Sequence, residues 1–149
     1  MSSWRETTSP QAQLDLDQLV SAALGLAQQL LATNHEFYPF AAAMTTDGAV
    51  EFIAGRGPDD GDDQPSSEAV LASCETILKS RRDELRAAGL IADVRTADGE
   101  AIQVDLEHAE GAALRILLPY TRHRLGRVKE YGDLSASMGL RRVWSGDQR

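Results

Sequence analysis

The sequence predicts an α+β fold, with a five-stranded antiparallel sheet and two main helices. Two segments carry apolar residues at helical spacing, and five short β-prone runs form three hairpins whose turns contain glycine. The chain has 149 residues, a length that fits one domain. We expect this domain to span residues 10–119, and residues 120–149 to form a basic C-terminal extension packed on it.

The first helix is predicted over residues 10–33. Ser9 is a good N-cap residue, and Pro10 suits the first helical position. Asn34 marks the expected end. The apolar residues that define the buried face are Leu16, Leu19, Val20, Ala23, Ala27, Leu30 and Leu31.

The second helix is predicted over residues 66–88, capped by Ser66 or Ser67 and ended by Gly89. Cys74 lies in its apolar stripe, so we expect a buried thiol with a raised pKa. The stripe comprises Val70, Cys74, Ile77, Leu78, Leu85 and Ala88.

Five strands are predicted around these helices. They are Phe40–Thr45, Ala49–Ala54, Leu90–Thr96, Glu100–His108 and Ala112–Leu118. Beyond Pro119 the pattern weakens, and we expect no more than a short helix at Asp133–Met138.

The register of the strands follows from a three-residue loop that ends in glycine. Such a loop at 46–48, 97–99 and 109–111 pairs apolar residues in all three hairpins. It sets Val94 opposite Ile102, and Asp105 opposite Arg115 on the polar face. A two-residue Asp98-Gly99 turn would instead bring Arg95 onto the apolar face, which is costly for an unpaired charge.

Charge is distributed unevenly along the chain, whose net charge is −8. Residues 1–119 hold 8 Lys and Arg against 20 Asp and Glu, whereas residues 120–149 hold 7 against 3. The acidic body argues against nucleic acid or an anionic membrane as partner. The basic extension can dock on its own body or on another molecule, and the sequence leaves both open.

The cellular compartment is predicted from three absences in the sequence. Residues 1–10 hold no apolar signal segment, no apolar run approaches the length of a membrane span, and Cys74 is the only cysteine. We therefore expect a cytoplasmic protein.

The sequence holds no motif that predicts a catalytic centre, a metal site or a cofactor. His35, His108 and His123 lack zinc-ligand spacing, and the glycines at 55–61 lack phosphate-loop spacing. The acidic loop 59–63 lacks the calcium-hand pattern. The sequence alone leaves open whether this loop binds a cation. Glu107-His108 looks like a catalytic dyad, but successive strand residues point to opposite faces.

The leading functional hypothesis is a non-catalytic interaction or regulatory module that binds a protein partner or a second copy of itself. Two alternatives remain: a small-ligand-binding protein or enzyme that uses the Asp105, Glu107 and Arg115 surface or the Tyr38–Tyr120 region, and an immunity-type inhibitor of a basic toxin. The candidate binding residues are Tyr38, Asp105, Glu107, Arg115, Tyr120, Arg122 and Trp144.

The predicted order of helix, two strands, helix and three strands resembles the roadblock (longin-like) domain family over about residues 10–118. The nearest sequence echo is 40–48, an apolar strand that runs into an Asp-Gly turn. This resemblance implies a regulatory dimerisation module with no catalytic residues to carry over. The polar outer face and the chain beyond residue 119 depart from the family. The phrases 36–40, 104–108 and 118–120 also resemble an uncharacterised family of small bacterial proteins, which implies no activity.

Overall fold

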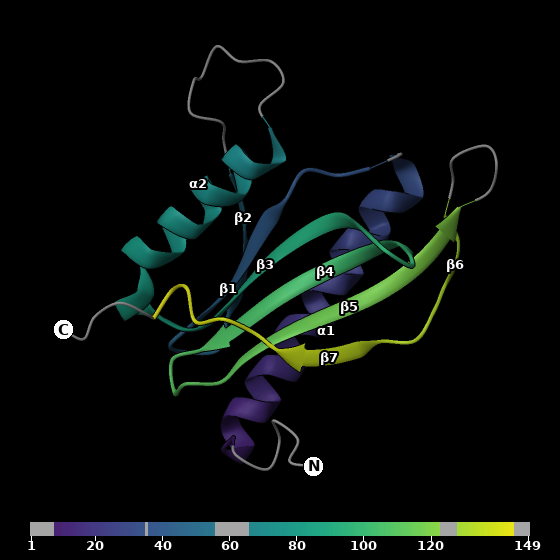
Figure 1. Cartoon of the computed structure of the whole chain (residues 1–149). Coiled ribbons are helices and arrows are strands. Elements are labelled where there is room, and N and C mark those ends of the chain that lie inside the picture. Colours follow the sequence, from purple (N-terminus) through teal and green to yellow (C-terminus); the bar gives the residue numbers. More distant parts are fainter. Residues whose placement is uncertain (1–7, 35, 56–65, 123–127, 145–149) are drawn as a thin grey trace.

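The computed structural model describes residues 8–34, 36–55, 66–122 and 128–144. They form one antiparallel sheet that carries a helix on each face (Figure 1). The strands are hydrogen-bonded in the order β2-β1-β3-β4-β5-β6, and β7 also pairs with β5. The elements are α1 (Pro10–Thr33), β1 (Phe40–Thr45), β2 (Val50–Ala54), α2 (Ser67–Ser80), the 3-10 turn η2 (Arg82–Glu84), β3 (Leu85–Thr96), β4 (Gly99–His108), β5 (Ala113–Arg122), β6 (Val128–Tyr131) and β7 (Ser135–Met138).

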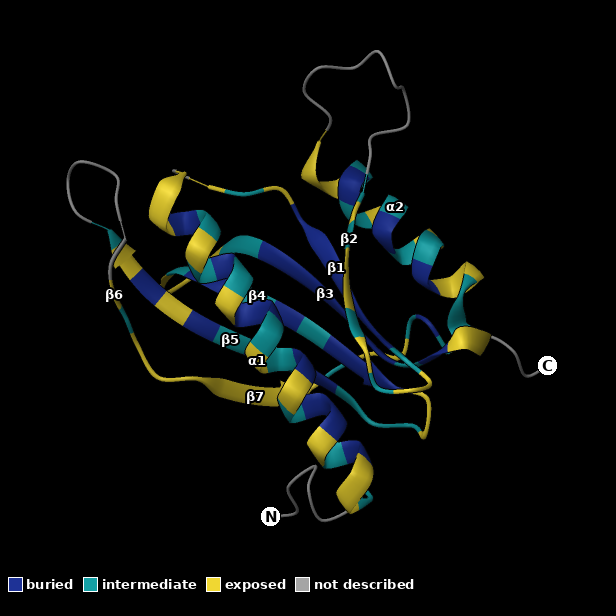
Figure 2. Ribbon diagram, turned by 180° about the vertical axis from the view of Figure 1, so that it is seen from behind, coloured by how far each residue is buried: buried dark blue, intermediate teal, exposed yellow. Residues whose placement is uncertain are grey.

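Helix α1 has the bounds that the sequence predicts. The Ser9 hydroxyl accepts a hydrogen bond from the Ala12 N–H at 3.1 Å, and the Asn34 N–H donates to the Leu30 carbonyl at 2.8 Å. Its apolar face packs on β1, β3, β4 and β5 and forms the larger core of the molecule, here called the α1 core (Figure 2).

Helix α2 ends earlier than predicted, so the expected helix over 66–88 is wrong beyond Ser80. Leu85 and Ala88 belong to β3, and Gly89 is a residue of that strand rather than a helix C-cap. The middle of β3 is buried on both faces. An unbroken apolar run of this kind has no alternation that would distinguish it from a buried helix.

The opposite face of β1 and β3 packs against α2 and forms a second, smaller core. We call it the α2 core. Cys74 is buried within it, and burial raises the pKa of its thiol, as predicted. Its buried members are Ala41, Ala43, Cys74, Leu78, Leu85, Ala88, Leu90 and Val143.

Within the described parts of the chain, the sheet has seven strands instead of the predicted five. The additional strands β6 and β7 come from the segment expected to be an extension, and the predicted short helix at Asp133–Met138 is strand β7. The expected domain boundary at residue 119 falls inside β5. Pro119 is tolerated there because its carbonyl points away from β4 and accepts from the Gly132 N–H at 2.8 Å, so β4 loses no hydrogen bond.

Two of the three predicted hairpin registers are confirmed. Met44 lies opposite Val50, and Asp105 lies opposite Arg115. The third is wrong by one residue, because Thr96 pairs with Gly99 around a two-residue Ala97-Asp98 loop.

This shift in the β3–β4 hairpin sets Asp93, rather than Val94, opposite Ile102 on the α1 face. The Thr96 hydroxyl closes the shorter loop by accepting from the Asp98 N–H and donating to the Gly99 carbonyl. Asp93 is accommodated among polar partners that the sequence pattern does not reveal.

Two glycines give a matched test of this backbone. Gly111 has a φ of 127°, whereas Gly25 lies within α1 with open space around its missing side chain. We expect Gly111→Ala to lower the free energy of unfolding by about 1 kcal/mol and Gly25→Ala to raise it by about 0.5–1 kcal/mol. Urea denaturation measures both, and changes of the same sign would contradict the described geometry.

Candidate functional site

Glu107 on β4 holds the segment of residues 139–144, here called the strap, against the sheet. Although it is a charged residue, it is only 4% exposed. Its Oε1 accepts from the N–H groups of Arg142 and Val143 at 2.7 and 2.8 Å. Its Oε2 accepts from the Trp144 N–H at 2.8 Å. Three successive backbone donors therefore converge on one carboxylate, and such charge-assisted bonds are among the stronger ones in proteins.

The strap leaves β7 in close contact with β5 and then crosses the face that carries α2 (Figure 1). The Gly139 N–H donates to the Ala113 carbonyl at 3.0 Å, and a Cβ at Gly139 would lie 2.7 Å from the Leu114 backbone. Glycine is therefore required at this close approach. Val143 then enters the α2 core, and its carbonyl accepts from Arg82 Nη1 at 3.1 Å.

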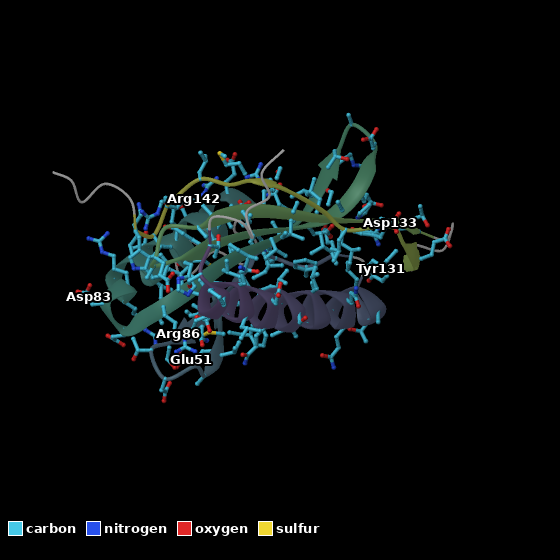
Figure 3. All side chains as sticks on the ribbon, turned by 90° about the horizontal axis from the view of Figure 1, so that it is seen from below. Glu51, Asp83, Arg86, Tyr131, Asp133 and Arg142 are labelled. Atoms are coloured by element: carbon cyan, nitrogen blue, oxygen red, sulfur yellow. The ribbon has the colours of Figure 1, made fainter. Side chains whose placement is uncertain are left out.

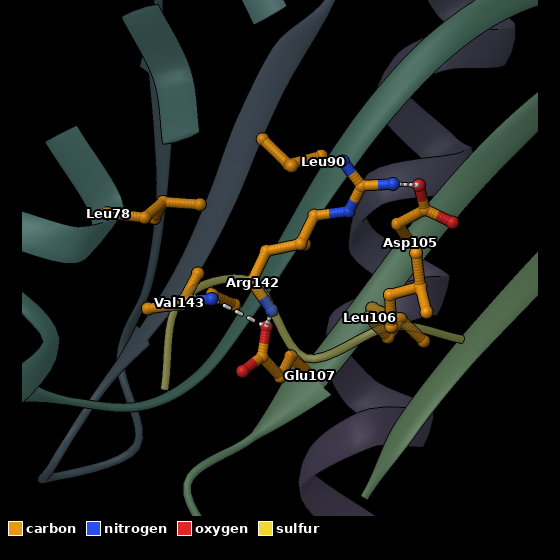
Figure 4. A pocket seen from close by; sticks show the side chains of 10 residues that line it. Leu78, Leu90, Asp105, Leu106, Glu107, Arg142 and Val143 are labelled. Carbon is orange, nitrogen blue, oxygen red and sulfur yellow. Dashed lines mark hydrogen bonds and ion pairs between the residues drawn. The ribbon is translucent and has the colours of Figure 1, made fainter. Parts of the chain in front are cut away.

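The strap closes a small pocket between α2, β3 and β4 (Figure 4). Its cavity volume is about 10 Å³, which is room for no more than one water molecule. Ligand pockets are commonly about 300–1,000 Å³. The pocket is therefore a packing feature of the strap. Its lining includes Leu78, Leu90, Asp105, Glu107, Arg142 and Val143.

Asp105 and Arg115 form a two-pronged ion pair on the same face. Arg115 Nε and Nη2 donate to the two carboxylate oxygens of Asp105 at 2.8 and 3.0 Å, and these bonds raise the pKa of Arg115. Arg142 of the strap lies 3.9 Å from Asp105 and 3.6 Å from Glu75 of α2. The ion pairs of Arg115 and Arg142 therefore link β4, β5, α2 and the strap.

The structure corrects the expected setting of the carboxylate pair on this face. Asp105 and Glu107 share a face, as strand alternation requires, but Glu107 does not lie on an open polar surface. The strap covers it, and its oxygens are occupied by backbone donors.

His108, the next residue along β4, points to the opposite face and contacts Asp15 of α1. Its Nε2 lies 2.9 Å from Asp15 Oδ2, and both side chains are buried. Its Nδ1 accepts from the Glu110 N–H at 3.1 Å, so the proton of the neutral ring is on Nε2. Both ring nitrogens therefore have partners within the chain, and the side chain is buried.

Arg86 completes this buried cluster at the start of α1. Its Nη2 donates to Asp15 Oδ1 at 3.0 Å, and its Nη1 donates to the Thr46 carbonyl at 3.1 Å. Burial opposes ionisation of Asp15. The hydrogen bonds from His108 and Gln11 and the charge of Arg86 outweigh that effect, so the pKa of Asp15 is lowered.

A third polar cluster lies near the opposite end of α1. The Tyr120 hydroxyl donates to Asp93 and accepts from Arg122 Nη2 at 3.0 Å, while Arg122 Nε donates to Glu100 at 2.8 Å. Burial raises the pKa of Asp93 despite the Tyr120 hydrogen bond, and burial together with Asp93 raises the pKa of Tyr120. The ring centroid of Tyr131 on β6 lies 6.1 Å from that of Tyr120 and so marks this cluster. Figure 3 shows Tyr131 and Arg86 at opposite ends of α1, with Arg142 across the sheet.

The structure distributes the seven predicted binding residues over several places. Asp105, Glu107, Arg115 and the backbone of Trp144 meet at the strap, whereas Tyr120 and Arg122 meet on the α1 face. Tyr38 is half exposed in the segment before β1. The expectations for His35, the acidic loop 59–63 and His123 fall outside the described residues.

The sequence patterns did not identify Asp15, Asp93 or Arg142 as members of these polar clusters. Asp15 has a usable signal, because it stands four residues before Leu19 on the apolar face of the predicted helix. A charge at such a position needs a buried partner. Asp93 and Arg142 carry no comparable signal, since their partners are set by a strand register and by the path of the strap.

Comparisons with family models, curated proteins and solved structures find no match to this chain. The resemblance to the roadblock family therefore stays a prediction. Among the described residues, no cluster of three His, Cys, Asp or Glu side chains is arranged to hold a metal ion. No helix in the same part of the chain is long and apolar enough to cross a membrane.

The Asp15 cluster predicts a specific dependence of stability on pH. Because the pKa of Asp15 is lower in the folded protein than its ordinary value of 3.8, its ionised form stabilises the fold above that pH. This contribution is lost as the pH falls through the folded pKa. We expect Asp15→Asn to lower the free energy of unfolding by about 1–3 kcal/mol at pH 7, and by progressively less towards pH 2.

Urea denaturation at several pH values measures this effect. Asp98→Asn, at an exposed turn residue, serves as the control and should change stability little at any pH. An equal loss for Asp15→Asn at pH 7 and pH 2 would contradict the assigned role.

Proposed function

We propose that this protein is a non-catalytic interaction module of the cytoplasm that binds a protein partner through the edges of its sheet. One observation carries the proposal. The charged clusters of the described residues direct their reactive atoms at partners within the chain, while large apolar side chains are exposed along the sheet edges. Exposed apolar groups of this kind are typical of interaction surfaces.

The edge strand β2 is the part of this surface best suited to a partner. β2 ends the hydrogen-bonded order of the described sheet, so one side of its backbone is available to an added strand. Phe52 on β2 is about half exposed and contacts Phe40, whose ring also contacts Phe37. Together with the exposed Tyr38, these rings supply aromatic anchors of the sort that dominate binding energy at interfaces.

The ligand-binding and enzyme alternatives receive less support from the geometry. Asp105, Glu107 and Arg115 bind one another or the strap, and the pocket beside them has no room for a substrate. An inhibitor of a basic toxin is a special case of the proposed module, and the net charge of −8 suits a basic partner.

Affinity capture from the organism that encodes the chain tests this proposal. The wild-type protein should retain a stoichiometric protein partner, and Phe52→Lys should lose it because the change puts a charge among the aromatic anchors. Leu14→Lys is the matched control, since Leu14 is 63% exposed on α1, away from β2. Equal capture by Phe52→Lys, or stoichiometric binding of a metabolite by the purified protein, would contradict the proposal.

A further inference from the structure

Strand β7 forms a sheet edge that lacks the usual protection against pairing. All four of its residues are exposed, and within the described chain it pairs with β5 alone (Figure 2). Residues 134–140 contain no charged residue and no proline. Natural sheet edges usually carry charges, prolines or bulges that prevent another chain from adding to them.

The hydrogen bonds that β7 leaves available can be assigned from its pairing. The Gly139 N–H donates to the Ala113 carbonyl, which places Gly139 in a hydrogen-bonded pair with β5. Because such pairs alternate along antiparallel strands, Ser137 and Ser135 also direct their backbone groups at β5. Ala136 and Met138 therefore direct their N–H and C=O groups outward.

The side chains of the same residues extend the α1 core to the edge. Met138 lies opposite Leu114 and Ala136 opposite Ile116, and both of these β5 residues belong to that core. Strand alternation puts Leu134 on the same face. Yet Leu134 is 56% exposed and Met138 is 91% exposed. The apolar layer of the sheet thus continues past its last covered strand.

The apolar pattern of β7 is complementary to itself. Large side chains stand two residues before and two residues after the small Ala136. An antiparallel pair centred on Ala136 sets Leu134 of one copy against Met138 of the other, twice. The intervening Ser135 and Ser137 lie opposite each other on the second face. This register uses the outward N–H and C=O groups identified above.

We propose that a second copy of this chain occupies this edge, through antiparallel β7–β7 pairing centred on Ala136. The inference rests on the proposed function, since it names one partner of the module. The lack of charge along this edge is compatible with the same choice. Two copies that each carry −8 repel, and the uncharged run 134–140 lets their backbones meet without bringing charges into contact.

Sedimentation velocity of the full chain between about 1 and 200 μM tests the proposal. The wild-type protein should shift from monomer to dimer as its concentration rises. Ala136→Pro removes an outward N–H without touching the bonds to β5, so it should leave the melting temperature of the monomer, measured at low protein concentration, unchanged. Met138→Lys adds an edge charge. Each variant should weaken the dimer at least tenfold, while Leu14→Lys should leave it intact.

A wild-type protein that stays monomeric over this range would overturn the inference, as would a dimer that persists in both edge variants. If Ala136→Pro fails to fold, Met138→Lys still decides the outcome, because its side chain is exposed. Partner capture through Phe52 involves the opposite edge of the sheet. Loss of the dimer with capture retained would therefore reject only this inference, and loss of capture with the dimer retained would reject only the partner surface at β2.

Discussion

The carboxylate of Glu107, which receives three successive backbone N–H groups, is the interaction on which the strap and its contribution to the α2 core depend. It fixes the path of the strap, so that Val143 completes the α2 core and Arg142 lies between Glu75 and Asp105. Hydrogen bonds to a charged group contribute roughly 1.5–3 kcal/mol each, whereas a buried carboxylate without partners costs several kcal/mol. Glu107 and the strap therefore require each other.

The same principle holds on the other face of β4. His108 follows Glu107 directly, and strand alternation turns it towards α1, where Asp15 and Arg86 complete a second closed cluster. Two neighbouring residues of one strand thus hold two different elements in place. Glu107 and His108, which resemble a catalytic dyad in the sequence, each bind partners within the chain and thereby hold the strap and α1 against the sheet.

The parts of the fold that could be predicted are those set by local pattern. The cap at Ser9 and the apolar stripe define α1, and the glycine turns define the β1–β2 and β4–β5 registers, including the pair of Asp105 with Arg115. The end of α2 could not be predicted, because the apolar run of β3 suits a buried helix and a doubly buried strand equally well.

The rest depends on contacts between distant segments. The observed register of β3 and β4 places Asp93 on the α1 face. This is possible because Tyr120, on another strand, donates a hydrogen bond to its carboxylate. Strands β6 and β7 are short and gain their order by pairing with β5. The partners of Glu107 are main-chain N–H groups about 35 residues away, and a main-chain donor has no signature in a sequence.

Amide hydrogen exchange at Arg142, Val143 and Trp144, compared between the wild-type protein and Glu107→Ala, tests this account most directly. We expect slow exchange at all three amides in the wild type and roughly 100-fold faster exchange in the variant, with the β4–β5 amides unchanged. Asp105→Ala, two residues away on the same face, should leave the three amides protected. Wild-type exchange as fast as that of an unstructured peptide, or equal protection in Glu107→Ala, would contradict the central role of this carboxylate.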